Sequence, residues 1–145
     1  VLFLQRMKIY FACSITGGRE YEKNYQAITR YLLDQGYEVP TAHLADSNIL
    51  DLERVVVPGE IYARDVDWIQ ASDILIAEVS VPSHGVGYEI GYALNLGKPV
   101  LCLYQAGRAV SKMITGNSDS LLSVKNYEDI AQALAEISAF VKIVT

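Results

Sequence analysis

Runs of apolar residues alternate along the chain with segments in which apolar residues recur every three or four positions. The apolar runs predict buried strands at 8–14, 37–40, 73–79, 100–104 and 121–124. The periodic segments predict helices at 19–35, 60–72, 88–96 and from 126 onward. Gly36 is placed to end the first helix, and Asn126 to cap the last. This alternation favours a parallel sheet covered by helices on both faces.

The predicted fold is α/β, with five parallel strands in the flavodoxin-like, doubly wound order 2-1-3-4-5. In that order a ligand binds at the carboxyl ends of the first and third strands, where the winding reverses. The loops that leave those ends are 14–20 and 80–89, the two loops richest in Gly and Ser. Residues 41–59 are mixed and polar and predict a long loop with room for one helical turn. Loops of that length in small domains are often functional.

Composition narrows the classes of protein that fit. The 145 residues are 51% hydrophobic and 20% charged, which is typical of one globular domain. We assign that domain to 7–145 and interpret 1–6 as an extension or tag remnant before Met7. The net charge of −5 gives no basic footprint for a nucleic-acid polymer. No apolar run reaches the roughly 20 residues of a membrane span.

The cysteines and histidines give no sign of a metal site. Cys13 and Cys102 lie inside apolar runs, which predicts buried, reduced thiols rather than a disulfide. The two Cys and two His are too scattered for any known ligand spacing. We therefore expect a cytoplasmic protein that uses neither a metal nor a cofactor.

The stretch "SVPSHGVGYEIG" raises the first chemical question, because it brings an acid to the start of a predicted helix. In the first helical turn, free N–H groups and the helix dipole would hold Glu89 ionised. Gly85 and Gly87 would let the backbone pass close to a ligand. A fixed carboxylate beside a small pocket suits a nucleophile or a stabiliser of positive charge. The alternative is an ordinary helix-capping glutamate.

Asp65 adds a second carboxylate. It falls on the apolar stripe that Ile61, Trp68 and Ile69 form, where a charge is costly unless it is paired or used. If Asp65 faces the crevice, desolvation would raise its pKa and suit it to a general acid. The alternative is a structural pair with a nearby arginine or loop N–H. Asp67 points away from the stripe and is expected to be solvated.

The loop "SITGGRE" supplies backbone N–H groups, a hydroxyl and the guanidinium of Arg19, which together favour anion binding. It matches no standard phosphate-binding motif, so a tight turn with an exposed arginine is the alternative. Two carboxylates in different environments near such a loop suggest glycosidic chemistry on a nucleotide. One carboxylate would attack or stabilise the anomeric carbon, and the other would protonate the leaving group.

Three segments, "IYFACSITGGRE", "ARDVDWIQASDILIAEVSVPSHGVGYEIGYAL" and "GKPVLCLYQAGRAVSKMITG", carry a family resemblance. Together they resemble the 2′-deoxynucleoside 5′-monophosphate N-hydrolases of the nucleoside 2-deoxyribosyltransferase superfamily, from Lys8 to about Tyr127. The resemblance implies a flavodoxin-like homodimer with a shared active site. It also implies hydrolysis of deoxynucleotides to free base and 2-deoxyribose 5-phosphate through a covalent glycosyl-Glu intermediate.

The resemblance also implies roles for individual residues. Glu89 matches the nucleophile, Asp65 the acid that assists departure of the base, and Tyr10 the tyrosine that positions the nucleophile. Ser14 and Ser83 match phosphate-binding serines, and Ser111 matches a serine that reaches the partner subunit's site. The expected substrate-binding set is Ser14, Ile15, Gly17, Gly18, Arg19, Ser83, Gly85, Gly87 and Ser111. Three positions depart from the family pattern: Cys13 replaces Gly, Thr16 replaces Arg, and His84 replaces an apolar residue. His84 would either touch the base or lie at the rim of the site, and we favour the rim.

Two other functions fit the same residues. A deoxyribosyltransferase would pass the sugar to a second base instead of water, although serines at phosphate-contacting positions favour a monophosphate substrate. A non-catalytic nucleotide-binding module would need neither Glu89 nor Asp65. Hydrolysis of ribosyl or modified nucleotides is a third possibility, and the sequence does not distinguish among the bases.

Overall fold

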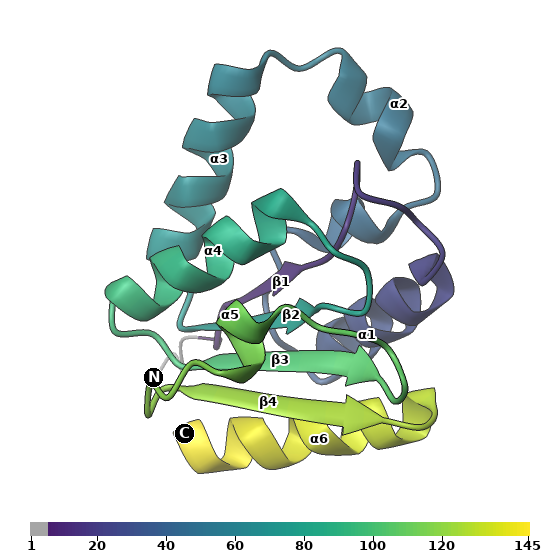
Figure 1. Cartoon of the computed structure of the whole chain (residues 1–145). Coiled ribbons are helices and arrows are strands. Elements are labelled where there is room, and N and C mark those ends of the chain that lie inside the picture. The colour runs from purple at the N-terminus through teal and green to yellow at the C-terminus, as the bar shows by residue number, and fades with distance from the viewer. Residues whose placement is uncertain (1–5) are drawn as a thin grey trace.

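A four-stranded parallel sheet forms the centre of the computed structural model, which describes residues 6–145 (Figure 1). Its strands are β1 (Ile9–Ala12), β2 (Ile74–Glu78), β3 (Val100–Gln105) and β4 (Leu122–Tyr127). They lie side by side in that order, with Tyr10 opposite Leu75 and Ile76 opposite Leu101. The predicted α/β class and parallel sheet are confirmed.

The prediction of five strands is wrong, because the strand expected at residues 37–40 does not form. Within the described part of the chain, residues 37–40 make only one parallel bridge, between Glu38 and Lys8 beside the start of β1. The Ile9 amide donates to the Glu38 carbonyl at 2.8 Å, and the Glu38 amide donates to Met7 at 3.0 Å. Pro40, which has no N–H to donate, follows at once, and the chain turns into a short helix. The segment lies where the second strand was expected but is too short to be one.

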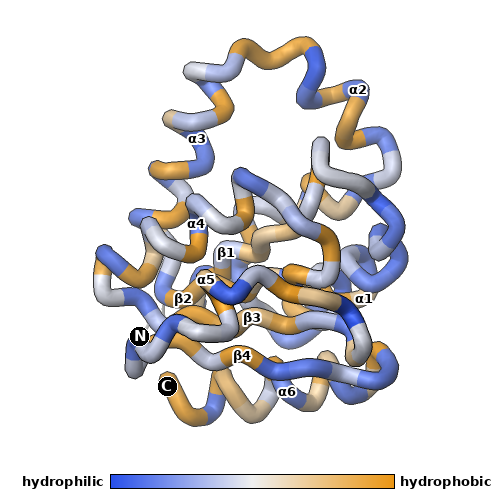
Figure 2. Tube along the Cα trace, viewed as in Figure 1, coloured by the Kyte–Doolittle hydropathy of each residue, from blue (hydrophilic) through white to orange (hydrophobic). Residues whose placement is uncertain are grey.

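Helices cover both faces of the sheet, as the continuous apolar strands predict. Along β1, Ile9 and Phe11 pack on the face covered by α1 (Glu22–Asp34) and α6 (Ile130–Val144). Tyr10 and Ala12 alternate with them and pack on the opposite face, beneath α3 (Pro58–Ala71) and α4 (His84–Asn95). Figure 2 shows the apolar colouring of the central strands between these layers. Cys13 and Cys102 are buried and unpaired, as predicted.

Several helix ends differ from their predicted positions. The α4 helix begins at His84 rather than Tyr88, because the Ser83 hydroxyl accepts a hydrogen bond from the Val86 amide. The last helix is capped by Asp129, and Asn126 lies within β4 instead. Gly36, with φ of +89°, follows the end of α1 as expected. A four-residue helix, α5 (Lys112–Thr115), was not predicted.

The predicted long loop at 41–59 contains two short helices. They are the 3₁₀ helix η1 (Ala42–Ala45) and α2 (Ile49–Arg54), and α3 begins at Pro58. The chain from α2 to α3 arches at the top of Figure 1, and Figure 2 shows apolar residues at its turn. Val55 and Val57 are exposed there.

Two further predictions concern the N-terminal extension and membrane-spanning segments. The proposed extension at 1–6 falls outside the described residues, except for Arg6. Among residues 6–145, no helix is both long and apolar enough to cross a membrane.

Candidate active site

A cavity of about 210 Å³ lies at the carboxyl ends of β1 and β2, where the fold predicts a ligand. The loop after β1, the loop after β2, and helices α2, α3 and α4 all contribute to its wall. Its lining residues are Cys13, Ile15, Thr16, Glu53, Ile61, Arg64, Asp65, Ser83, Gly85, Val86 and Glu89. The cavity therefore brings together both carboxylates that the sequence singled out.

Glu89 faces this cavity from α4, and Tyr10 on β1 contacts Glu89 from the core. The Tyr10 ring is fully buried, and its hydroxyl donates a hydrogen bond to Glu89 Oε2. Because α4 begins at His84, Glu89 lies in the second turn, and its expected place in the first turn is wrong. The helix dipole acts mainly within the first turn, so it gives Glu89 little help. Burial instead raises the pKa of Glu89 from its ordinary value of 4.5 to about 8.

Asp65 lines the same cavity from α3. Its Oδ1 accepts a hydrogen bond from Arg64 Nε at 2.9 Å, so it is both paired and placed at the cavity. Burial raises the pKa of Asp65, the Arg64 charge lowers it, and the Glu53 charge raises it; the net change is upward. A carboxyl with a raised pKa keeps its proton to higher pH, as a general acid requires. Asp67 is exposed, as expected.

The loop after β1 packs tightly against the loop after β2. A Cβ on Gly17 would lie 2.5 Å from the Pro82 carbonyl oxygen and 3.0 Å from Ser14 Oγ. Gly18 has φ of +133°, a conformation that other residues rarely adopt. Ser14 is fully buried, and its hydroxyl has no hydrogen-bond partner within residues 6–145. Ile15 faces the cavity.

Arg19 does not reach the cavity. Its guanidinium donates to the carbonyls of Ser14, Leu44 and Asp46, each at 3.0 Å. It also pairs with Glu22 at 3.0 Å, and its side chain is only 12% exposed. These bonds tie the loop after β1 to η1, so the guanidinium is fully engaged inside the protein.

The remaining predicted residues divide between the cavity and an adjoining groove. Ser83 and Gly85 line the cavity, and Ser83 also lines the groove, which has a volume of about 590 Å³. Gly87, His84 and Ser111 line only the groove, so His84 lies at the rim. The Ser111 hydroxyl caps α5 by accepting from the Met113 amide at 3.2 Å. The serine matched to the partner's site is thus exposed at the groove that Ser83 also lines, outside the cavity of its own chain.

Sequence reasoning missed Glu53 and Arg64 as site residues. Arg64 lies between two carboxylates, with Nη2 2.8 Å from Glu53 Oε1 and Nε 2.9 Å from Asp65 Oδ1. Its guanidinium also stacks 4.8 Å from the centre of the Trp68 ring. The sequence offered one signal for Arg64, its place beside Asp65. It offered none for Glu53, which belongs to a helix within the predicted loop.

A second buried carboxylate supports the loop after β2. Glu78 ends that strand and is fully buried. It accepts hydrogen bonds from the Ser80 amide at 2.6 Å, the Ser80 hydroxyl at 2.9 Å and the Tyr127 hydroxyl. The Arg108 Nε donates to the Ser80 carbonyl at 3.3 Å. This network fixes the chain just before the cavity wall.

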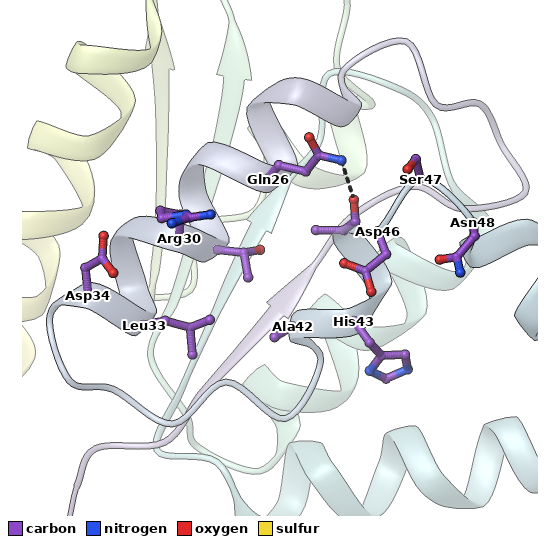
Figure 3. Close-up of a pocket in the computed structure, with 11 residues that line it drawn as sticks. Gln26, Arg30, Leu33, Asp34, Ala42, His43, Asp46, Ser47 and Asn48 are labelled. Carbon is purple, nitrogen blue, oxygen red and sulfur yellow. Dashed lines mark hydrogen bonds between the residues drawn. The ribbon is translucent and has the colours of Figure 1, made fainter.

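A larger hollow of about 900 Å³ lies elsewhere, between α1 and η1 (Figure 3). Its lining includes the charged or polar side chains of Arg30, Asp34, His43 and Asp46. The Gln26 side-chain amide donates a hydrogen bond to the Ala45 carbonyl at 3.2 Å. It shares no lining residue with the Glu89 cavity. The paired carboxylates make the smaller cavity the candidate active site.

Relatives of the chain carry names from one class of enzyme. A protein of Methanosarcina mazei, named by inference a 2′-deoxynucleoside 5′-phosphate N-hydrolase, is 46% identical over 91% of this chain and 81% of its own. A 5-hydroxymethyl-dUMP N-hydrolase of Rattus norvegicus is 44% identical over 77% of this chain and 70% of its own.

Solved structures share the fold. A CMP N-glycosidase of Clostridium botulinum superposes with a TM-score of 0.70 at 22% identity, covering 92% of this chain and 98% of its own. A 2-deoxyribosyltransferase of Bacillus psychrosaccharolyticus superposes with a TM-score of 0.62 at 23% identity, covering 88% of this chain and 90% of its own. The sequence profile of the nucleoside 2-deoxyribosyltransferases matches residues 9–132. The chain therefore belongs to the nucleoside 2-deoxyribosyltransferase family.

Proposed function

We propose that this protein hydrolyses the N-glycosidic bond of 2′-deoxynucleoside 5′-monophosphates to free base and 2-deoxyribose 5-phosphate. One observation carries the proposal: Glu89 and Asp65 line one small cavity, and Tyr10 is hydrogen-bonded to Glu89. The names of relatives that are 38–46% identical support the same reaction.

The two carboxyl groups divide the chemistry. Ionised Glu89 attacks the anomeric carbon as the bond from that carbon to the base nitrogen breaks. Asp65 gives its proton to the departing base. Water then attacks the deoxyribosyl-Glu89 ester, returns a proton to Asp65 and releases the sugar phosphate. Tyr10 holds Glu89 in position, and its O–H favours the ionised form of that carboxyl.

The phosphate binds at the junction of the loops after β1 and β2. Among residues 6–145 the Ser14 hydroxyl is buried without a partner, and Ser83 lines the cavity from the position just before α4. Gly17, Gly18 and Gly85 keep the backbone of these loops clear of side chains. Arg19 acts by holding the first loop in place, because its own donors are engaged.

The test is base release from each deoxynucleoside 5′-monophosphate and from the matching nucleoside. We expect the monophosphate to react faster, because only it reaches the Ser14 and Ser83 hydroxyls. Equal rates would contradict the proposed phosphate site and would leave the roles of the two carboxylates untouched. Ribonucleotides in the same panel test whether the deoxy sugar is required.

The active unit is a homodimer in which Ser111 completes the partner's site. The groove that holds Ser111 is mainly apolar and adjoins the cavity through Ser83 and Val86. Met113 is 85% exposed there and Tyr88 is 53% exposed, so a second copy would cover apolar surface.

Mixing Ser111→Ala subunits with Glu89→Gln subunits tests the shared site. One site of each hybrid dimer then carries neither change, so activity should return. If subunits exchange but no activity returns, Ser111 serves its own chain or no site at all.

Transfer of the sugar to a second base is the other candidate, because the matching profile is that of deoxyribosyltransferases. Adding a free acceptor base to the reaction separates the two. A hydrolase yields 2-deoxyribose 5-phosphate regardless of the acceptor, whereas a transferase yields a new deoxynucleotide.

A further inference from the structure

Glu53 is the one carboxylate at the cavity to which the proposed reaction assigns no role. It lies on α2, lines the cavity with Asp65 and Glu89, and its side chain is only 11% exposed. Its Oε1 is 2.8 Å from Arg64 Nη2. Its Oε2 is buried and has no hydrogen-bond partner within residues 6–145.

A buried carboxylate oxygen without a partner is costly, because it has given up water and gained nothing in return. Glu53 is fixed in this state by Arg64, which is itself held by Asp65 and by the face of Trp68. A structural ion pair would gain most by using both oxygens in a bidentate contact. Here one oxygen is left without a partner among residues 6–145, and it belongs to a residue that lines a substrate cavity.

The position of Glu53 assigns it to one part of the substrate. Arg64 joins it directly to Asp65, the proposed donor of a proton to the leaving base. The phosphate-binding serines lie on the other loops, after β1 and β2. Glu53 is therefore on the side of the cavity that receives the base.

We propose that Glu53 Oε2 accepts a hydrogen bond from the base, and that the enzyme thereby selects bases bearing an exocyclic hydroxyl or amino donor. A carboxylate paired with arginine can only accept, so a base with a methyl group or hydrogen at that place leaves the oxygen unpaired. Sites built to bond a substrate donor reject analogues that lack it far more strongly than apolar pockets reject a missing methylene. This inference rests on the proposed function, since it assumes that a base occupies the cavity.

Two matched pairs of substrates test the inference. 5-Hydroxymethyl-dUMP and dTMP differ by one hydroxyl, and dAMP and purine 2′-deoxyriboside 5′-monophosphate differ by one amino group. The measurement is kcat/KM for base release from all four, with the wild-type protein and with Glu53→Gln. The glutamine can still bond Arg64 through its amide oxygen, and it presents an N–H₂ donor where Oε2 was.

We expect the wild-type protein to prefer the donor-bearing member of at least one pair by about tenfold or more. In Glu53→Gln that preference falls to near unity or reverses. Comparing the two proteins on the same pair cancels differences in how readily each base leaves. Loss of Asp65 orientation alone would lower all four rates, with the largest fall for the base that leaves least readily, and would not remove the preference for the donor in both pairs. Glu60→Gln, an exposed glutamate in the first turn of α3 outside the cavity, is the matched control.

The outcomes distinguish a failure of the role of Glu53 from a failure of the proposed function. Base release with no donor preference in either pair, or a preference that Glu53→Gln leaves intact, overturns the role of Glu53 alone. Absence of base release from all four substrates overturns the proposed function, and this inference with it. Thermal unfolding of Glu53→Gln confirms that any change is measured on folded protein.

Discussion

Tyr10→Phe isolates the hydrogen bond on which the reactivity of Glu89 depends. The ring is fully buried in the core between β1 and α4, so phenylalanine keeps the packing and removes only the hydroxyl. That hydroxyl donates to Glu89 Oε2. Burial already raises the pKa of Glu89 to about 8, so the carboxyl is short of stabilisation for its charge.

The size of the effect follows from the strength of a hydrogen bond to a charged group, about 1.5–3 kcal/mol. One pKa unit corresponds to about 1.4 kcal/mol, so removing the donor should raise the pKa of Glu89 by about one to two. Below the wild-type pKa, each increase of one pKa unit lowers the ionised fraction of Glu89 about tenfold. Tyr10→Phe should therefore be about ten- to a hundredfold slower at pH 7. The difference should narrow as the pH rises above the pKa of the variant.

The assay is kcat/KM for base release between pH 5 and 10, expressed as the ratio of variant to wild type. The ratio removes the titration of Asp65, which both proteins share. Tyr92→Phe, on the same helix as Glu89 but bonded to Gln70, is the control and should give a constant ratio. A Tyr10→Phe ratio that does not change with pH would refute the idea that this hydroxyl governs the ionisation of Glu89.

Three further predictions concern stability and loop packing. Glu89→Gln should raise the melting temperature above about pH 8. The raised pKa makes the folded state bind a proton that the unfolded state has lost, and the glutamine removes this cost. The gain in stability, at most about 5 kcal/mol, should vanish below the ordinary pKa of 4.5. Tyr127→Phe should lower the free energy of unfolding in urea by about 1–3 kcal/mol, because buried Glu78 loses a donor; an unchanged midpoint would contradict this. Gly17→Ala should raise KM for the monophosphate, because its Cβ would lie 2.5 Å from the Pro82 carbonyl; Gly91→Ala, with nothing within 4 Å, should not.

The sequence predicted the parallel sheet because its strands are buried on both faces and appear as continuous apolar runs. It failed at residues 37–40, where an extended pattern ends at Pro40 after one bridge. It also placed the start of α4 too late, because Gly85 and Gly87 resemble a turn. In the structure the Ser83 cap starts the helix before them.

The site was predictable where a residue broke its local pattern. Asp65 stood out as a charge on an apolar stripe, and it lines the cavity. Glu53 followed no local rule, because its place depends on how α2 packs beside α3. Arg19 looked free in the sequence, but the carbonyls that occupy it belong to Leu44 and Asp46, 25 and 27 positions away.

The most direct test of the central claim is the stereochemistry of methanolysis. If Glu89 attacks the anomeric carbon and methanol then displaces it, two inversions give net retention. A β-deoxynucleoside 5′-monophosphate in buffered methanol should yield the β-methyl glycoside of 2-deoxyribose 5-phosphate, which proton NMR distinguishes from its anomer. Glu89→Gln should yield neither anomer at a comparable rate. An α-methyl product would show direct attack by solvent and would contradict the assignment of Glu89 as the nucleophile.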